Sequence, residues 1–321
     1  MAMTLVDMAK GMKDELMQGV MLQFAQQSLL YQMLPFDDVN AWNVTQWQAE
    51  SVSNAGFRRI GSPPAEQVDV FDKKNESVYI MSGKIDIDVA LLEPVSREFN
   101  SYVENVAVQA DRFRYGFSDA FINGDRTVDP DKFNGLKRRI ADLNAGGFTD
   151  VLVPADSASS GLELGSTSAK RHQFLDKFED AEFEVADGMV DIILTSKKGY
   201  HALGRVGRRE GLLDTTRDMF GRKVIDFRGI PILWAGTLGN QTTEIITSTE
   251  DPGDGGNDAT SYYFCRLGSN HVRGIQLAPI KKIYDQVTSD AITHRIAFDW
   301  YVGLRSNKRS AVRLSKVVPN F

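Results

Sequence analysis

Apolar residues between positions 96 and 123 recur at steps of three and four, which is the period of an α-helix that buries one face. Ser96 can cap the first turn, and Gly124 follows the last apolar residue, where glycine allows a left-handed stop. At about 1.5 Å per residue, a helix over 96–123 spans a whole small domain. The repeating apolar positions are Phe99, Tyr102, Val103, Val106, Ala110, Phe113, Phe117, Ala120 and Phe121.

The segments on either side of this helix predict a strand before it and a turn after it. Residues 84–91 alternate apolar side chains with polar or small ones, which is typical of a half-buried strand. Residues 124–131 are rich in Asp and contain Gly and Pro, a composition typical of turns. The chain then returns to apolar structure at residues 133–136, Phe-Asn-Gly-Leu. The expected order is strand, long helix, acidic turn and short return.

The first 34 residues carry apolar side chains at roughly helical spacing, so we expect a helical arm there. Seven of the ten methionines lie within the first 33 residues. Methionine is flexible, so it suits contacts that repack between states, but an ordinary core helix explains the spacing equally well. Gly11 and Gly19 argue against one unbroken helix.

Residues 42–83 contain too few apolar side chains to form a core of their own. Trp42 to Trp47 alternates cleanly, residues 61–64 read Gly-Ser-Pro-Pro, and residues 72–76 are polar. We therefore predict a long two-stranded extension.

Residues 143–290 predict a mixed α/β region. Residues 189–194 form an apolar run typical of a buried strand, and residues 196–207 predict a basic helix. Residues 251–258 are rich in Asp and Gly, so we expect a flexible excursion between strands.

The order and spacing of five segments resemble the major capsid proteins of tailed phages, which have the Hong Kong ninety-seven type fold. In that family a spine helix leads into an apolar-apolar-x-Gly-Asp turn and then an apolar-x-Gly-Leu segment. Residues 121–125 and 133–136 match these two motifs. Residues 294–304 resemble the long closing strand of the family, and residues 310–314 resemble its last strand. Residues 229–232 are similar to a Gly-apolar-Pro-apolar strand of its axial domain.

The resemblance implies an α+β capsid fold with an arm, an extended β-hairpin loop, a peripheral domain with the spine helix, and a mixed α/β axial domain. The closing strands pair with the spine-helix region in this family, so the domains are expected to be discontinuous. The expected limits are 1–41 for the arm, 42–83 for the loop, 84–142 with 291–321 for the peripheral domain, 96–123 for the spine helix and 143–290 for the axial domain.

Composition agrees with a folded protein of one elaborated domain or two interleaved ones, since 42% of the 321 residues are hydrophobic and 25% are charged. The formal charge of -6 argues against a protein whose main work is to bind nucleic acid. An acidic container, in contrast, would not trap the polyanion that it encloses. No apolar run is long enough to span a membrane, and we expect no signal peptide at the N-terminus, because Asp7, Asp14 and Glu15 interrupt its apolar residues.

No local motif in the sequence matches a catalytic or metal site. Residues 161–166 lack the lysine and the spacing of a phosphate-binding loop. The histidines, at positions 172, 201, 271 and 294, are at least 23 residues apart, which gives no metal-ligand spacing. Cys265, the single cysteine, excludes an internal disulfide and is expected to be a small buried hydrophobe.

Three charged groups allow a second interpretation, although an ordinary surface role is favoured for each. Asp86 and Asp88 could bind a divalent ion, but on an alternating strand they face the same side as solvated carboxylates. The acidic loop 251–258 departs from the helix-loop-helix calcium pattern. The basic cluster Arg205, Arg208 and Arg209 could contact phosphate, but a solvated helix end or an intersubunit ion pair explains it better.

The resemblance implies a structural major capsid subunit of a tailed bacteriophage rather than an enzyme, with no catalytic, cofactor-binding or metal site. Hexamers and pentamers of this chain would build an icosahedral shell around a double-stranded DNA genome, held as non-specific content. Family members often carry a long N-terminal scaffolding extension, whereas this chain has only a short arm before Trp42. A separate scaffolding protein, a portal and an optional decoration protein are therefore the expected partners, with no membrane. The expected location is the virion capsid, and the host cytoplasm during assembly.

Some members of the family link neighbouring subunits through a lysine–asparagine isopeptide bond. Lys73 or Lys74 lies in the right kind of extended loop, but no matching Asn or Glu can be assigned, so we expect no crosslink. Two other functions remain open. An encapsulin-type compartment shares the fold and encloses cargo enzymes, whereas an unrecognised α/β hydrolase or transferase would need a pocket built from distant residues.

Overall fold

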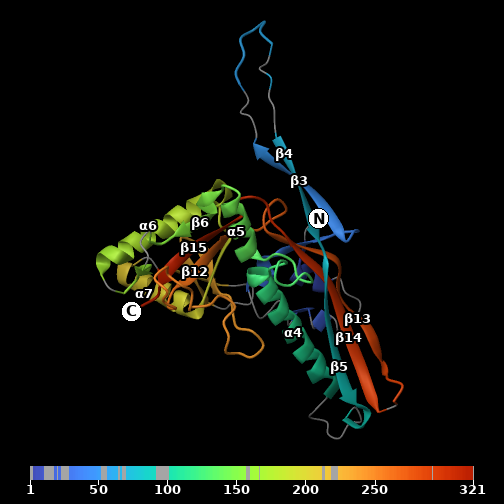
Figure 1. The fold of residues 1–321 in the computed structure, drawn as a ribbon. Coiled ribbons are helices and arrows are strands. Elements are labelled where there is room, and N and C mark those ends of the chain that lie inside the picture. The colour runs from blue at the N-terminus through green and yellow to red at the C-terminus, as the bar shows by residue number, and fades with distance from the viewer. Residues whose placement is uncertain are drawn as a thin grey trace.

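The computed structural model of the chain describes residues 3–10, 18–19, 21–22, 29–51, 56–63, 66, 70–91, 101–156, 160–165, 167–211, 214–217, 223–290 and 292–320. Figure 1 shows two lobes side by side, with a β-hairpin that projects far beyond both of them. One lobe is elongated and holds a long helix beside long strands, and the other is a wedge of helices over a second sheet.

The elongated lobe contains a five-stranded sheet. Its long strands pair antiparallel, the closing strand predicted over 294–304 lies at their centre, and the edge strand Tyr79–Asp88 buries Ile85 and Ile87 as the alternation predicts. The predicted strand 84–91 is wrong beyond Asp88, because the Asp88 carboxylate accepts the Ala90 amide at 2.9 Å and the chain turns into a short 3-10 helix. In spatial order the strands are β1 (Met3–Thr4), β2 (Pro35–Asp38), β13 (Arg273–Val287), β14 (Thr293–Arg305) and β5 (Tyr79–Asp88), which continues into η1 (Val89–Leu91).

The predicted long helix is confirmed as α4 (Ser101–Asn123), and the part of the prediction that begins at Ser96 lies outside the described residues. Its apolar face packs on the sheet through an aromatic cluster. The fully buried Phe117 ring lies 5.0 Å from the Trp300 ring of β14 and 5.9 Å from the Phe36 ring of β2. One core therefore joins the N-terminal strand, the long helix and the closing strand.

The turn after α4 needs glycine for a different reason from the one predicted. Gly124 does not have a positive φ, so the left-handed stop is wrong. Instead Gly135 donates its amide to the Gly124 carbonyl at 2.8 Å, and the two backbones touch. A Cβ on Gly135 would lie 2.5 Å from the Ala120 carbonyl oxygen and 2.8 Å from the Gly124 nitrogen. The two Gly motifs of the sequence are thus the two sides of one backbone contact, after which α5 (Leu136–Ala145) begins.

The N-terminal segment is not one long helix in the described residues. Its described residues form β1, α1 (Leu5–Lys10), helical pieces at 18–19 and 21–22, α3 (Leu29–Met33) and β2, and β2 pairs parallel with β13. Leu5, Tyr31 and Phe36 are fully buried against the elongated lobe. The helical period of this segment is weak, and burial of its side chains against the elongated lobe decides which residues form helix and which form strand.

The wedge contains the second sheet, with α6 (Ser168–Glu184) and α7 (Lys197–Glu210) on one face. Alternate residues of the strand Thr260–Cys265 point to opposite faces, so Tyr262 packs under these helices while Tyr263 faces the core of the elongated lobe. The spatial order is β6 (Leu152–Pro154), β15 (Ala311–Val318), β12 (Thr260–Cys265), β8 (Ile192–Thr195), β11 (Ile230–Trp234), β10 (Lys223–Phe227) and β9 (Asp214–Arg217), with β7 (Leu162–Glu163) beside β15 and the short η2 (Thr149–Val151) and η3 (Ala186–Gly188) near α6.

Several local predictions for the wedge are confirmed. The buried strand expected over 189–194 is β8, which begins three residues later, at Ile192, and whose four residues are all buried. The basic helix is α7, and the Ser196 hydroxyl caps it by accepting the Gly199 amide at 3.0 Å. The segment 229–232 opens β11 after a two-residue turn in which Arg228 and Gly229 both have positive φ, 52° and 86°.

Sheet membership differs from the predicted domain limits at two strands. β13 comes from the segment assigned to the axial domain, yet it pairs with β14 in the elongated lobe because the two strands are joined by a short turn. β15 comes from the segment assigned to the peripheral domain, yet it pairs with β12 in the wedge. The chain therefore crosses between the lobes again after β14.

The extension predicted within 42–83 is a β-hairpin of β3 (Asn43–Ser51) and β4 (Val70–Ser77), paired antiparallel. It projects away from both lobes (Figure 1), and β4 leads through Val78 into β5. β5 begins at Tyr79, so the second strand of the extension and the edge strand of the lobe run on from each other. Among the described helices, none has the length and apolarity needed to cross a bilayer.

Candidate functional site

The metal sites considered from the sequence do not form in the described ranges, where no group of three or more His, Cys, Asp and Glu side chains could hold a metal ion. Asp86 accepts two hydrogen bonds from the Arg295 guanidinium, at 2.7 and 2.9 Å, and these bonds hold the pKa of its carboxyl below the usual value. Asp88 caps the start of η1. The two carboxylates thus have the ordinary surface roles that the sequence favours.

The histidines and the cysteine are also separate from one another. Cys265 is fully buried in β12, and this burial raises the pKa of its thiol far above the ordinary value. A thiol that keeps its proton is a poor nucleophile, which fits the expected role of a small buried hydrophobe. The histidine contacts are His172 with Glu210 at 3.2 Å, His271 with Ser310 at 3.4 Å and His294 with Asp285 at 3.1 Å.

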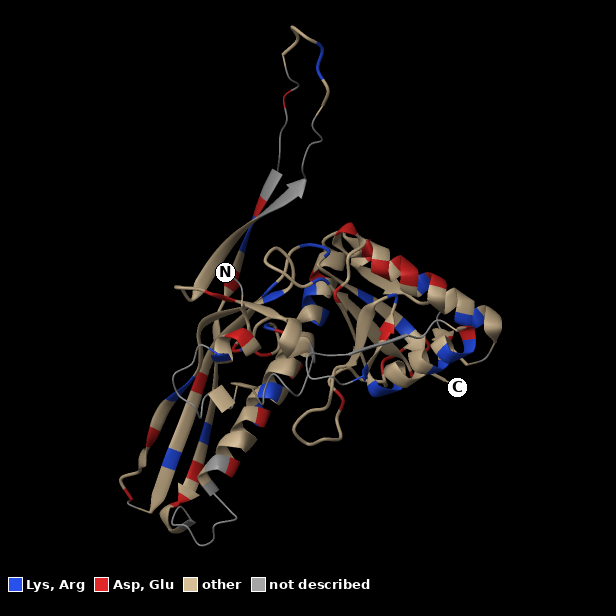
Figure 2. Ribbon diagram, turned by 180° about the vertical axis from the view of Figure 1, so that it is seen from behind, with Lys and Arg blue, Asp and Glu red and all other residues tan. Residues whose placement is uncertain are grey.

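The remaining charged candidates lie at the surface of the wedge. Figure 2 shows acidic residues along α6 and basic residues on α7. Arg205, Arg208 and Arg209 are all exposed on α7. In the loop 251–258, the Asp251 carboxylate accepts backbone amides of its own loop, at 2.7 and 3.0 Å, so it closes a turn. Residues 161–165 lie around β7, and residue 166 is outside the described part of the chain.

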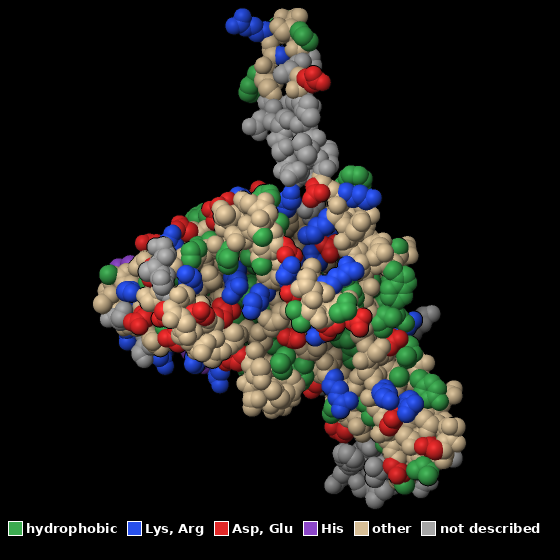
Figure 3. All heavy atoms as spheres, in the orientation of Figure 1, with side chains coloured by type: hydrophobic (Ala, Val, Ile, Leu, Met, Phe, Trp, Pro, Cys, Tyr) green, Lys and Arg blue, Asp and Glu red, His purple; other side chains and the backbone are tan. Residues whose placement is uncertain are grey.

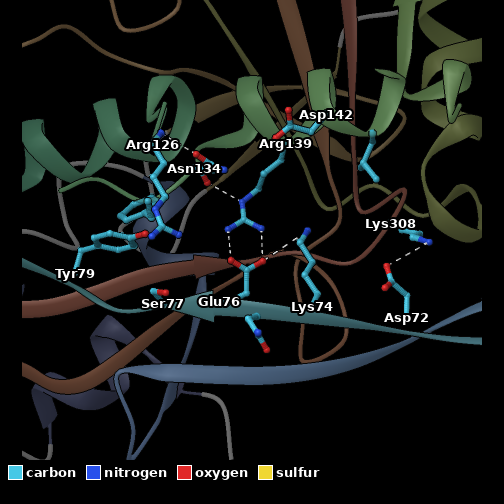
Figure 4. Close-up of a pocket in the computed structure, with 13 residues that line it drawn as sticks. Asp72, Lys74, Glu76, Ser77, Tyr79, Arg126, Asn134, Arg139, Asp142 and Lys308 are labelled. Carbon is cyan, nitrogen blue, oxygen red and sulfur yellow. Dashed lines mark hydrogen bonds and ion pairs between the residues drawn. The ribbon is translucent and has the colours of Figure 1, made fainter. Parts of the chain in front are cut away.

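A buried ion pair fastens the base of the hairpin to the elongated lobe (Figure 4). The Arg139 guanidinium of α5 binds both Glu76 carboxylate oxygens of β4, at 2.6 and 2.8 Å. Its other N–H groups donate to the carbonyl oxygens of Asn134 and Leu304, both at 2.7 Å, and to the Ser306 hydroxyl at 3.2 Å. All five guanidinium donors are therefore used, which is what makes a buried arginine tolerable.

Two further contacts strengthen this base. Gln46 of β3 is buried. Its side chain accepts a hydrogen bond from Arg305, at the end of β14, and donates one to Asn307, just beyond that strand. Lys74 lies 3.6 Å from Glu76, and its pKa is lowered by burial and by the Arg139 charge nearby. The hairpin thus leaves the body from a rigid, ordered base.

The far end of the hairpin is exposed, in contrast to its buried base. In residues 56–63 every side chain is exposed, and Phe57 and Ile60 are exposed to 108% and 106% of their reference areas. Arg58 and Arg59 lie between them, and Figure 3 shows basic and hydrophobic side chains together at this tip. Phe57 and Ile60 are therefore free to contact another molecule, because the projecting hairpin does not bury them.

Two surface pockets present apolar residues with opposite charges around them. A groove of about 350 Å³ between β5 and α4 is lined mostly by apolar or small residues, with three aspartates and one lysine among them: Tyr79, Ile80, Met81, Ser82, Gly116, Ala120, Phe133, Val302, Asp119, Asp129, Asp131 and Lys132. A second pocket, of about 400 Å³ on the wedge, is lined by Trp234 and other apolar residues together with basic side chains: Lys197, Lys223 and His201.

Sequence reasoning missed the Arg139–Glu76 pair and the tip residues. Glu76 lies in a polar run that looks solvated, and Arg139 lies in a basic run, so nothing local marks either as buried. The tip left a signal that could have been used. Phe57 and Ile60 are large apolar residues isolated in a segment rich in Gly, Ser, Pro and Arg, which cannot bury them locally.

No family model matches the sequence, and no curated protein sequence matches it. Solved structures do. The chain is similar to the holo-SrpI encapsulin complex from Synechococcus elongatus PCC 7942, with a TM-score of 0.63, 14% identity and coverage of 91% of this chain and 88% of that chain. It is similar to the capsid of the native GTA particle, with a TM-score of 0.58, 13% identity and coverage of 90% and 91%. It is also similar to the satellite phage P4 procapsid including its size determination protein, with a TM-score of 0.54, 8% identity and coverage of 94% and 99%.

Proposed function

Because this chain has the fold of phage major capsid proteins, the Hong Kong ninety-seven type, we propose that it is a structural subunit of a tailed-phage shell that encloses double-stranded DNA. The observation that supports this most directly is the hairpin. It extends from a rigid buried base to a tip whose apolar side chains have no cover from their own chain. In the proposed shell, a neighbouring subunit would bury these side chains. The proposal includes no catalytic, cofactor or metal site.

The proposed assembly proceeds by heterologous contacts, in which one surface of a subunit meets a different surface of the next. Such contacts close into rings when the rotation between subunits fits, and here into pentamers and hexamers of an icosahedral shell. The hairpin would lie over the adjacent subunit, and the N-terminal arm would add contacts. The proposal keeps the domain limits expected from the sequence, except that β13 belongs to the elongated lobe and β15 belongs to the wedge.

The proposed partners are a separate scaffolding protein, a portal and an optional decoration protein, with DNA as non-specific content. Support for a separate assembly partner comes from the similar P4 procapsid, which includes a size determination protein. The proposed location is the virion capsid, with the host cytoplasm as the site of assembly.

The test of this function is negative-stain electron microscopy with sedimentation, on the chain alone and with its candidate scaffold. We expect closed shells, or rings of five and six subunits, with normal shells only when the scaffold is present. A strictly monomeric protein under all conditions would contradict the proposal and favour an enzyme with a pocket from distant residues. Normal shells from the chain alone would contradict the separate scaffold.

An encapsulin-like compartment is the second candidate, because the similar SrpI complex is an encapsulin. Its shell would contain cargo enzymes instead of DNA. Nuclease-protected DNA in purified particles would support the phage shell, whereas a stoichiometric co-purifying enzyme without DNA would support the compartment.

The double variant Phe57→Ser/Ile60→Ser is expected to fold normally and to assemble poorly. Neither side chain contacts the body, so the free energy of unfolding of the monomer should change by less than about 0.5 kcal/mol. Burial of such a side chain contributes about 1.5–3 kcal/mol, so the contact between subunits should weaken by roughly 100-fold or more. Sedimentation of assembling mixtures measures this, with Ser62→Ala as the control tip variant. Normal assembly of the double variant would contradict a role for the tip.

Mature particles are expected to contain no covalent ladder on denaturing gels. The lowered pKa of Lys74 makes a neutral amine more accessible, but Glu76 holds that amine at 3.6 Å and is itself bound to Arg139. Lys73 is exposed and lies over the Trp47 ring. A ladder that Lys74→Arg or Lys73→Arg removes would contradict this expectation.

A further inference from the structure

The exposed face of α7 carries charge of one sign. The helix buries its glycines and apolar residues against the wedge sheet and leaves six side chains exposed, each of them basic or a histidine (Figure 2). The one carboxylate of the helix, Glu210, is bound by Arg171 at 2.9 Å and by His172 at 3.2 Å. We call this surface the α7 basic face, and it consists of Lys197, Lys198, His201, Arg205, Arg208 and Arg209.

The position of α7 on the sheet is fixed by close backbone contact. The Tyr262 hydroxyl donates to the Gly199 carbonyl at 2.9 Å, and a Cβ added to Gly199 would collide with the Thr195 hydroxyl oxygen. The exposed cations therefore lie on a rigid element rather than on a loop. They recur at steps of three and four residues, about 5–6 Å apart along the helix axis. The face is thus a rigid row of positive charge over the whole helix.

The positive charge continues beyond the helix. Lys223 of β10 is exposed and lines the same pocket as Lys197, beside Trp234. Within the described part of the chain, neither of these lysines nor Lys198 forms an ion pair. The face therefore keeps positive charge available to an anion from outside.

The rest of the molecule has the opposite charge. The formal charge of the whole chain is -6, so the surface outside the α7 basic face is more acidic than the net value indicates. Most of the surface repels a polyanion, and the α7 basic face attracts it. This asymmetry orients an approaching polyanion toward one side of the wedge.

The acidic helix α6 of a second copy fits this face less well than a polyphosphate does. Three carboxylates of α6 already form ion pairs in their own chain: Glu179 with Arg228 at 2.5 Å, Asp180 with Lys177 at 2.9 Å and Glu184 with Arg309 at 3.8 Å. A contact between α6 and α7 of two copies would compete with these pairs. Duplex DNA carries one negative charge per about 1.7 Å of its axis, and its condensed counterions are released when cations of a protein replace them.

We infer that the α7 basic face, together with Lys223, binds the phosphate backbone of duplex DNA. Phosphate contacts carry no sequence information directly, so the binding is independent of base sequence. The inference rests on the proposed function, because duplex DNA is the proposed content of the shell. It adds that the α7 side of the wedge faces the lumen.

Binding of a short fluorescent DNA duplex to the unassembled chain tests the inference without any need for a shell. The variant Lys197→Gln/Lys198→Gln/Arg208→Gln should bind about tenfold or more weakly than the original chain. The slope of log K against log salt should become shallower by about 2–3, since each lost phosphate contact removes about 0.9. Glutamine is a good helix former, so circular dichroism should show an unchanged fold.

Two further variants control for net charge and for the lysine positions. Three exposed lysines away from α7 are replaced in Lys84→Gln/Lys137→Gln/Lys281→Gln, which changes the net charge equally and should leave the salt slope unchanged. Lys197→Arg/Lys198→Arg keeps the charge of the face and should bind the duplex as the original chain does.

Three outcomes of the binding test would overturn the inference. The first is an equal loss of affinity in the α7 variant and in the control with three lysines replaced. The second is the absence of measurable binding by the original chain at about 50 mM salt, where phosphate contacts are strong. The third is binding of poly-glutamate as tightly as the duplex, which would assign the face to an acidic protein partner.

Photo-crosslinking in filled particles tests the orientation of α7. Cys265 is fully buried, so a thiol introduced by Lys198→Cys is the one that an aryl-azide reagent labels. Light should link this position to the packaged DNA, whereas the same reagent at Lys84→Cys should give much less linkage. Filled particles without a link at position 198 would reject the inference and leave the proposed function standing. Particles without nuclease-protected DNA would reject the proposed function, on which binding by the unassembled chain does not depend.

Discussion

Gly135→Ala is expected to lower the free energy of unfolding by about 3 kcal/mol or more, which is a large fraction of the stability of an ordinary domain. An added Cβ would lie 2.5 Å from the Ala120 carbonyl oxygen and 2.8 Å from both the Gly124 nitrogen and the Ile122 carbonyl oxygen. These are backbone atoms at the end of α4, so no side chain can rotate away to make room. The turn must open, and α5 must move with it.

Urea unfolding of the unassembled chain measures this effect, followed by fluorescence and circular dichroism. Gly124→Ala should be comparably destabilising, because its Cβ would meet the carbonyl oxygens of Phe133 and Ala120. Gly56→Ala is the control, since nothing lies within 4 Å of its added Cβ and its φ is not positive. Equal midpoints for Gly135→Ala and Gly56→Ala would show that the contact between the two glycines is not needed.

Arg139→Met is expected to destabilise the chain by about 3–5 kcal/mol, because it leaves the buried Glu76 carboxylate with only the longer contact to Lys74, at 3.6 Å. It also removes the donors that the carbonyl oxygens of Asn134 and Leu304 accept from. The hairpin base should loosen, so proteolysis between β3 and β4 should accelerate along with the loss of stability. Thermal unfolding and limited proteolysis of the same samples measure both effects.

The chain offers a matched control for this prediction. Arg295 also binds a carboxylate through two bonds, at 2.7 and 2.9 Å from Asp86, but both side chains are more than a third exposed. Arg295→Met should therefore lower the stability much less than Arg139→Met does, because water screens an exposed pair. The double variant Arg139→Met/Glu76→Leu should recover part of the loss, since it no longer buries a carboxylate that has lost its arginine. A loss from Arg139→Met no larger than that from Arg295→Met would contradict the anchoring role of the pair.

The predicted elements were accurate where one face of the chain packs against a core over several turns. α4 and β5 follow from periods of 3.6 and 2 residues, because burial of one face leaves a local trace in the order of side chains. β8 was predicted from a short apolar run, and β14 was expected from the resemblance to the capsid family. The arm was less predictable. Its short elements depend on contacts with β13 and with α4, which no local period can specify.

The candidate contact surfaces were also predictable only in part. The two-stranded extension was predicted because its alternation continues without enough apolar residues for a core. The buried ion pair at its base and the exposed residues 56–63 at its tip were not predicted. Glu76 and Arg139 are 63 residues apart, and each resembles a solvated charge until the fold brings them together.

The sequence by itself determined the long helix, the strand before it, the turn after it, the extension, the mixed region and, through the two Gly motifs, the resemblance to a capsid fold. Only the tertiary structure decided that β13 and β15 lie in different lobes from those predicted, that Gly124 and Gly135 are two sides of one contact, and that a buried ion pair holds the hairpin. The physical reason is the separation in sequence between the residues that interact. A period along the chain records which face is buried, whereas the choice of partner depends on packing between segments that are distant in sequence.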